Sequence, residues 1–122
     1  MLADLGIKLD ESISYIRKAL ELEPTNGAFV DSLGWVYFKK GMLDEAILEL
    51  ERSLQLSMMN DPTIHEHLGD AYFQKGLIPQ AIAEWEKSVQ LNGENREELL
   101  RKIEEGKKGL LRMPKEQGSG EN

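Results

Sequence analysis

Two histidines, His65 and His67, are the residues of this 122-residue chain whose types best suit metal binding or acid–base catalysis. On a helix, a spacing of two residues turns their side chains about 200° apart, so one chain cannot direct both imidazoles at a single metal ion. The sequence contains no cysteine, no glycine-rich phosphate loop and no pairing of histidine with a candidate nucleophile. We therefore expect no metal site, no cofactor and no enzymatic activity, and we expect His65 to be packed or half-exposed.

Aromatic and acidic side chains offer a second kind of chemistry, the recognition of a peptide. Residues 31, 35, 38 and 39 share one face of a helix, because steps of three and four return to the same side, and a 35-residue repeat places 66, 70, 73 and 74 beside them. The expected peptide-binding residues are Asp31, Trp35, Phe38, Lys39, Glu66, Asp70, Phe73 and Gln74. Three rings bordered by three carboxylates favour an apolar anchor flanked by Lys or Arg. In the alternative interpretation, Phe38 and Phe73 pack against neighbouring repeats and only Trp35 is free.

The 35-residue interval comes from two similar segments, LGWVYFKKGMLDEA from Leu33 and LGDAYFQKGLIPQA from Leu68. The residues that match at this interval are Leu33 and Leu68, Gly34 and Gly69, Tyr37 and Tyr72, Phe38 and Phe73, Gly41 and Gly76, Ala46 and Ala81, and Leu56 and Leu91. Upstream, residues 9–26 resemble residues 42–60, the second half of the unit. The chain thus contains one partial copy and two full copies of a repeat.

Apolar residues inside each copy are spaced by three and four, which indicates helices rather than strands. Glycines after residues 40 and 75, and Asp61 before Pro62, mark helix ends, so helices are predicted near 9–22, 27–40, 43–56, 62–75, 78–91 and 96–111. We expect copies at 1–26 (the end of a first helix plus a second helix), 27–61 and 62–95, then a capping helix at 96–112. Residues 113–122 are expected to be a disordered tail, whose GSGEN resembles an expression linker.

The repeated residues resemble those of the tetratricopeptide repeat (TPR) family. The family pattern of Leu-Gly, Tyr, Gly and Ala is met by Leu33, Gly34, Tyr37, Gly41 and Ala46, and again 35 residues later. The resemblance covers about residues 1–95. It implies an all-α, right-handed superhelical solenoid of helix-turn-helix repeats, and a concave face on which peptides or helices of partner proteins dock.

Charge disfavours two related kinds of binding. A subset of the family holds the C-terminal carboxylate of heat-shock chaperones with Lys, Asn and Arg, but Asp31 and Glu66 stand where this clamp needs a lysine or asparagine. The 35-residue period also resembles RNA-binding pentatricopeptide repeats, whose groove is positive, whereas Asp70 and the same two acids occupy the comparable face. With a net charge of −7, we expect no nucleic acid partner.

Hydropathy places the chain outside membranes. No stretch approaches the ~20 apolar residues of a membrane span, and the N-terminus has an aspartate where a signal peptide needs an apolar run. We therefore expect a soluble chain without membrane insertion, and the sequence does not indicate its compartment.

The expected function is a protein–protein interaction scaffold whose concave face docks a partner segment of basic and apolar character. The alternative is a structural spacer or self-association unit of a larger repeat protein, with no peptide ligand. The first copy lacks most of its first helix, which suggests a fragment of a longer array and leaves Leu9, Ile13 and Ile16 without a covering helix. We expect a weak homodimer through this N-terminal edge. Trp35 is expected to be exposed, and Trp85 to be a core residue.

Overall fold

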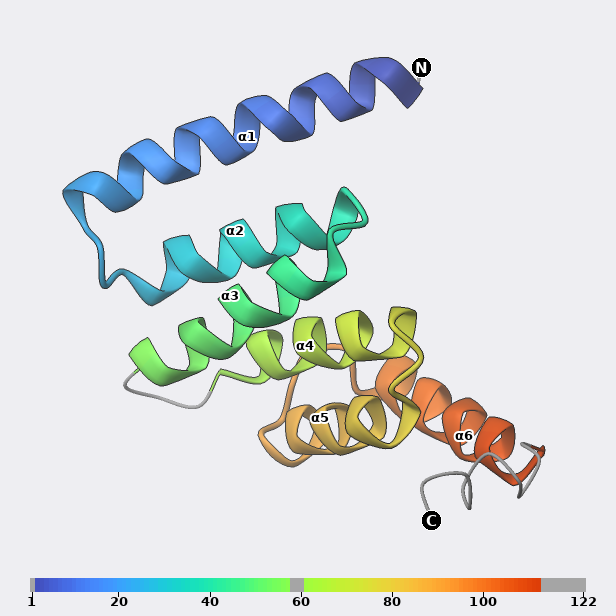
Figure 1. The fold of residues 1–122 in the computed structure, drawn as a ribbon. Helices are drawn as coiled ribbons and strands as arrows, with labels where there is room; N and C mark the ends of the chain where they lie inside the picture. Colours follow the sequence, from blue (N-terminus) through green and yellow to red (C-terminus); the bar gives the residue numbers. More distant parts are fainter. Residues whose placement is uncertain (1, 58–60, 113–122) are drawn as a thin grey trace, which may run out of the picture.

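The computed structural model describes residues 2–57 and 61–112, with side chains from residue 8 onward. Within these residues the chain forms six α-helices and no strand: α1 (Leu2–Leu22), α2 (Gly27–Lys39), α3 (Leu43–Leu56), α4 (Pro62–Gln74), α5 (Ile78–Gln90) and α6 (Arg96–Arg112). Each helix packs against the next, and α2 also contacts α4, so the helices stack in chain order (Figure 1). The predicted all-α repeat solenoid is confirmed. The predicted tail, 113–122, lies outside the described residues.

The ends of the helices are set locally, by side-chain caps at the start and by glycine at the end. The Asn26 side chain accepts a hydrogen bond from the N–H three residues later at 3.1 Å and caps α2. Asp61 caps α4 by accepting a hydrogen bond from the N–H of Thr63, two residues later, at 2.9 Å. Gly41 and Gly76 follow α2 and α4 with φ of 84° and 87°, a left-handed conformation that favours glycine. All described helices except α1 begin and end within one residue of the predicted positions.

Each full repeat is a hairpin in which a glycine lets two helices approach closely. A Cβ atom built on Gly34 of α2 would lie 2.7 Å from Leu50 Cγ of α3. A Cβ atom built on Gly69 of α4 would lie 2.5 Å from Trp85 Cδ1 of α5. Leu50 and Trp85 are 0% and 2% exposed, which confirms the prediction that Trp85 is a core residue. Neither glycine could carry a side chain without displacing a buried neighbour.

A buried serine joins the two helices of each hairpin through a second contact. Ser53 Oγ donates to the Gly27 carbonyl at 2.8 Å, and Ser88 Oγ donates to the Pro62 carbonyl at 2.8 Å. Both serines are 0% exposed, so each hydroxyl needs the partner that it finds. The two serines are 35 residues apart, and so are the residues that carry the two carbonyls. The same buried hydrogen bond therefore recurs in both full copies of the repeat.

The N-terminal helix differs from the predicted arrangement. α1 is one continuous helix of 21 residues, where the sequence analysis predicted the end of one helix followed by a second helix. Residues 2–8 contain no proline, and Gly6 alone costs about 1 kcal/mol, which is too little to interrupt a helix. A single helix therefore replaces the two that were expected within residues 1–26.

The apolar stripe that was expected at an open N-terminal edge packs inside the chain. Ile13 is 8% exposed and belongs to an apolar cluster with Leu33 and Tyr37 of α2. Ile16 is partly buried against the same cluster, and Leu9 is half-buried. The expectation that this stripe lacks cover is wrong for Ile13 and Ile16, because α1 turns them toward α2.

Candidate functional site

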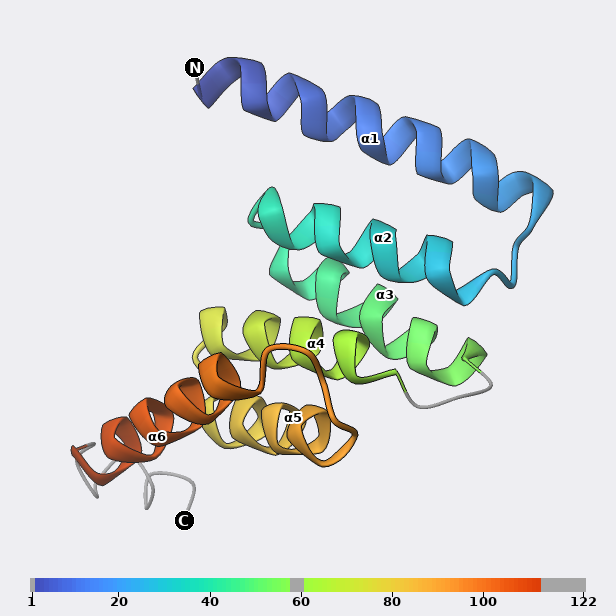
Figure 2. The same ribbon diagram turned by 180° about the vertical axis from the view of Figure 1, so that it is seen from behind.

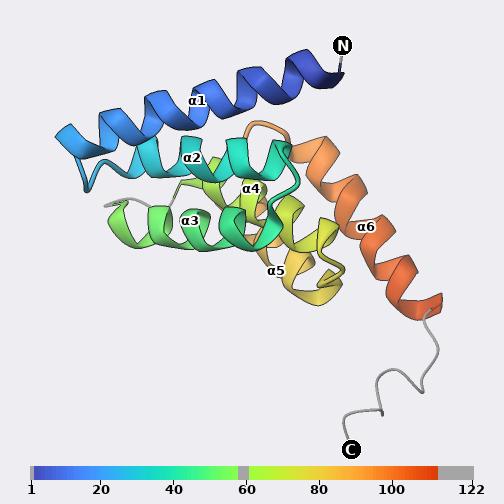
Figure 3. The ribbon, with the colours of Figure 1, turned by 45° about the horizontal axis from the view of Figure 1, so that its top comes forward.

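Residues of α2, α4, α5 and α6 line a cavity of ≈ 380 Å³, which we call the aromatic pocket. Its lining residues are Trp35, Phe38, Lys39, Asp70, Phe73, Gln74, Trp85, Arg101, Lys102 and Glu105. Six of the eight expected peptide-binding residues are among them, and Asp31 and Glu66 are not. Figure 2 shows α6 starting beside α4, and Figure 3 shows it running at an angle to α1, α2 and α3. Through this orientation, α6 supplies one wall of the pocket.

Stacked rings form the α2 side of the pocket. Trp35 stacks with Phe38 and with His67, at centroid distances of 4.8 Å and 4.0 Å and interplanar angles of 11° and 20°. Lys39 Nζ lies 4.9 Å from the Trp35 ring centroid, within cation–π distance. Trp35 is half-buried, so its ring is less exposed than the sequence analysis expected. Phe38 also packs against two adjacent apolar clusters, as the alternative interpretation proposed.

The α4 side of the pocket presents a ring that the repeats do not bury. Phe73 is 43% exposed and lies tilted against Trp85, with ring centroids 5.6 Å apart. In the alternative interpretation Phe73 packs against neighbouring repeats, but the structure leaves this side chain largely exposed. The pocket therefore combines a rigid buried indole with an accessible phenyl ring.

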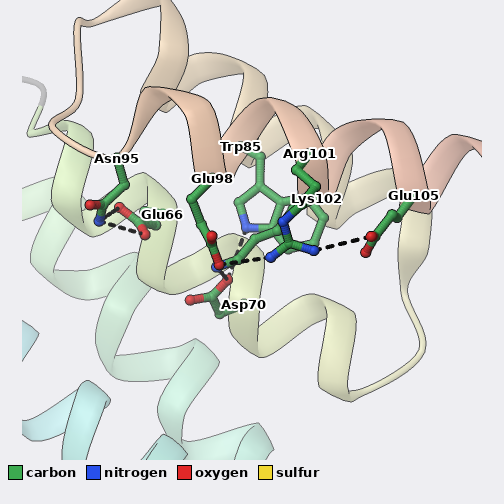
Figure 4. A network of polar contacts seen from close by, with 8 residues as sticks. All are labelled: Glu66, Asp70, Trp85, Asn95, Glu98, Arg101, Lys102 and Glu105. Carbon is green, nitrogen blue, oxygen red and sulfur yellow. Dashed lines mark hydrogen bonds and ion pairs between the residues drawn. The ribbon is translucent and has the colours of Figure 1, made fainter.

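Asp70 connects three helices through one oxygen atom. Its Oδ1 accepts a hydrogen bond from Trp85 Nε1 and another from Lys102 Nζ, each at 3.0 Å, and Figure 4 shows Lys102 reaching Asp70 from α6. The bond to Asp70 satisfies the buried indole N–H, which would otherwise carry a desolvation cost. Lys102 Nζ also lies 5.7 Å from the centroid of the Trp85 ring. Asp70 thus holds α5 and α6 in place around the pocket.

Arg101 lies on α6 between two carboxylates. It donates to Glu98 at 2.9 Å and to Glu105 at 3.0 Å, along the surface of the helix (Figure 4). The hydrogen bonds that Arg101 donates to Glu98 and Glu105 raise the pKa of Arg101 above its ordinary value, so the guanidinium stays charged. Because these ion pairs are exposed, we expect them to orient the side chains more than to stabilise the fold.

The two predicted residues that lie outside the pocket lining pair with side chains elsewhere in the chain, one on α4 and one in the turn before α6. Asp31 Oδ1 lies 3.0 Å from His67 Nδ1, which joins α2 to α4. Glu66 accepts hydrogen bonds from Asn95 Nδ2 at 3.2 Å and 3.1 Å, as Figure 4 shows. With Asp70, all three carboxylates that were expected to face a ligand are engaged within the chain.

The contribution of α6 to the pocket was not predicted from the sequence, where this helix was expected to be a cap. Adding 35 to positions 66, 67 and 70 gives Arg101, Lys102 and Glu105, the three residues of α6 that line the pocket. Extending the repeat interval by one further step would therefore have found them. Trp85 was predicted only as a core residue. The apolar pattern of a helix does not distinguish a buried core side chain from one that also lines a pocket.

The two histidines point to different helices. His65 is buried and its Nδ1 lies 2.7 Å from Glu84 Oε1 of α5, whereas His67 contacts α2. This divergence agrees with the angle expected for residues two apart on a helix. Among the residues whose side chains the structure describes, no three His, Cys, Asp or Glu form a group that could hold a metal ion. Over the same part of the chain, no helix combines the length and apolarity of a bilayer crossing.

Two family models match the chain. One, described as TPR repeat, matches residues 34–76, and the other, described as Tetratricopeptide repeat, matches residues 8–26. Together they cover about half of the chain. A comparison with curated protein sequences finds no match.

Solved structures with the same fold include TPR domains. The first TPR of Spaghetti (RPAP3), bound to the HSP90 peptide SRMEEVD, aligns with a TM-score of 0.79 and 19% identity over 85% of this chain and 81% of that chain. The Sgt2 TPR domain from Aspergillus fumigatus aligns with a TM-score of 0.76 and 18% identity over 99% of this chain and 78% of that chain. The N-terminal domain of stress-induced protein-1 (STI-1) from C. elegans aligns with a TM-score of 0.65 and 20% identity over 85% of this chain and 95% of that chain. The repeat pattern, the two family models and this shared fold agree, and the chain belongs to the tetratricopeptide repeat family.

Proposed function

We propose that the chain is a protein-interaction module in which the aromatic pocket anchors a peptide or helix of a partner protein. The observation that carries this proposal is the group of rings that the fold leaves accessible, with Trp35 and Phe38 half-buried and Phe73 43% exposed. Aromatic residues of this kind are enriched at the energetic centres of interfaces. The peptide bound by the first TPR of Spaghetti supports the proposal by analogy of fold.

The pocket has the size and rigidity that an anchor site needs. Its volume of ≈ 380 Å³ falls within the ~300–1,000 Å³ of typical ligand pockets and would admit one large apolar side chain. Its walls stand on helices that the Gly69–Trp85 contact and the Asp70 hydrogen bonds hold together, so little ordering is needed on binding. We propose a binding role without catalysis.

The apolar contact, rather than a basic flank, is proposed to provide most of the binding free energy. A basic partner was expected because of Asp31, Glu66 and Asp70. Each of these carboxylates already has a partner in its own chain. A Lys or Arg of the ligand would have to share or displace those partners, which reduces what it could contribute.

Peptide selection with a pocket variant tests the proposal. Random peptides displayed on phage would be selected on the wild-type chain, then synthesised and titrated against Trp35→Ala and Tyr15→Ala. We expect at least ten-fold weaker binding to Trp35→Ala, because an interface anchor contributes more than about 1.4 kcal/mol. Tyr15 is the matched control, since it is 70% exposed on α1 and does not line the pocket. Failure to select any peptide, or equal binding to Trp35→Ala, would refute the docking function.

Self-association is a second candidate function, and the outer face of α1 favours it. Tyr15 and Leu22 are 70% and 85% exposed and stand seven positions apart, on one side of the helix. A second copy could cover this face instead of Leu9, Ile13 and Ile16. The net charge of −7 opposes pairing, so we expect a weak dimer that strengthens as salt screens the repulsion. Sedimentation of the wild type and of Leu22→Glu over a range of salt tests this, and a salt-independent monomer would contradict it.

A further inference from the structure

We propose that the aromatic pocket binds an apolar side chain together with a neighbouring side-chain carboxylate of the same partner segment, and that this carboxylate pairs with Lys39. The inference rests on the proposed docking function and specifies the chemistry of the ligand. The ligand side chain beside the apolar anchor is thus expected to be negative, whereas the sequence favoured a positive one. Most charged groups of the pocket already have partners within the chain, and Lys39 differs from them.

Lys39 is a cation of the pocket wall that has no counter-charge among the residues whose side chains the structure describes. Its side chain is exposed, and it takes part in none of the ion pairs formed by the described residues. Its Nζ lies 4.9 Å from the centroid of Trp35, beside the ring against which an apolar ligand side chain would pack. A carboxylate next to that apolar side chain would therefore arrive close to Lys39.

The other charged residues of the pocket are already paired. Lys102 is bound to Asp70 at 3.0 Å, and Arg101 is bound to Glu98 at 2.9 Å and to Glu105 at 3.0 Å. Of the three cations in the lining, Lys39 is the one that forms no ion pair with a described residue. The unmatched group is thus positive, and a ligand carboxylate completes the set.

A basic ligand fits this arrangement less well, although the whole chain is acidic. Its charge would lie among three cations, and the two carboxylates available to it already hold Lys102 and Arg101. The net charge of −7 repels an acidic ligand at a distance. At physiological salt, however, exposed charges are screened beyond about 8 Å. Long-range repulsion should therefore slow association, whereas the contact with Lys39 sets the preference within the complex.

The carboxylate is assigned to a side chain rather than to the end of a chain. Lys39 is exposed and offers a single ammonium group. One such group is enough to pair with a side-chain carboxylate that also stays in contact with water. A terminal carboxylate held by several donors would need Arg101 and Lys102 as well. Both would have to leave their present carboxylate partners.

The experiment combines peptide selection with a double-mutant cycle. Random peptides displayed on phage are selected on the wild-type chain, on Lys39→Met and on Lys108→Met. Lys108 is the matched control, because it is an exposed lysine of α6 outside the pocket lining. On the wild type and the control, we expect peptides with Asp or Glu within two positions of a large apolar residue. On Lys39→Met, we expect this acidic preference to disappear.

The leading peptide is then synthesised with an acetylated N-terminus and an amidated C-terminus, in its acidic form and with Glu→Gln or Asp→Asn. Titration against the wild type should show about 2- to 5-fold weaker binding of the neutral form, the range of an exposed ion pair. Against Lys39→Met, the two forms should bind equally. Circular dichroism of each variant confirms that Lys39→Met leaves the helices intact, as expected for an exposed residue.

The outcomes separate this inference from the docking function. Peptides that bind through Trp35 without an acidic residue, or a neutral form that is weakened equally on both chains, would overturn the pairing with Lys39 and leave the docking function standing. Binding that requires a free C-terminus would overturn the choice of a side-chain carboxylate. Absence of any Trp35-dependent peptide would overturn both proposals.

Discussion

Gly69 is the position at which one added methyl group should disturb both the core and the pocket. A Cβ atom there would lie 2.5 Å from Cδ1 and from Nε1 of Trp85, and Trp85 is only 2% exposed, so the indole ring would have to move. Displacing a packed ring costs about 1–3 kcal/mol, and weakening its hydrogen bond to Asp70 costs about 1 kcal/mol more. Alanine recovers about 0.5–1 kcal/mol as the better helix former. We expect Gly69→Ala to lower the free energy of unfolding by about 1–3 kcal/mol.

Gly109→Ala is the matched control for this prediction. A Cβ atom built on Gly109 of α6 meets no other segment within 4 Å, so this change should raise the free energy of unfolding by about 0.5–1 kcal/mol. Urea unfolding followed by circular dichroism measures both variants. In a Trp85→Ala background, the cost of Gly69→Ala should shrink, because the ring that it strikes is gone. A Gly69→Ala variant as stable as Gly109→Ala would refute the close approach of α4 and α5.

Three further predictions concern single side chains. Trp85→Ala should lower the free energy of unfolding by about 3–5 kcal/mol and Trp35→Ala by less, since only Trp85 is fully buried; equal losses on urea unfolding would contradict this. Burial raises the pKa of Tyr72, and a hydrogen bond to a glutamate of α3 raises it further, so the folded state favours the neutral phenol. The free energy of unfolding should therefore fall as the pH rises above about 10, the ordinary pKa of tyrosine. Unfolding measured against pH should show a smaller fall for Tyr72→Phe, whereas Tyr15→Phe, at an exposed position, should match the wild type. Ile13→Glu puts a charge into the contact with α2 and should release α1 alone, seen as loss of amide protection in hydrogen exchange confined to that helix.

The helices could be predicted because their causes act over one or two turns. Apolar spacing, the Asp61 cap and the left-handed glycine Gly41 are short-range features, and they place the described helices after α1 to within one residue. Gly34 and Gly69 match at the repeat interval, and the structure shows that their lack of a side chain lets the two helices of each hairpin approach closely. The prediction was wrong at α1, where two helices were expected because the repeat contains two. The sequence has no local helix-ending signal there, and one continuous helix forms.

Periodicity alone establishes which face of α2 and α4 carries the rings, but it does not tell which side chains meet on that face. The bond between Asp70 and Lys102 joins positions 32 residues apart, and the bonds from Asn95 to Glu66 join positions 29 apart. No sequence pattern specifies such contacts, because they depend on the angle at which α6 passes α4 and α5. The count of charges on a face follows from its residues. The charge that a ligand would meet depends on which of those residues neighbouring helices have already paired, and in this chain that leaves Lys39 rather than the carboxylates available.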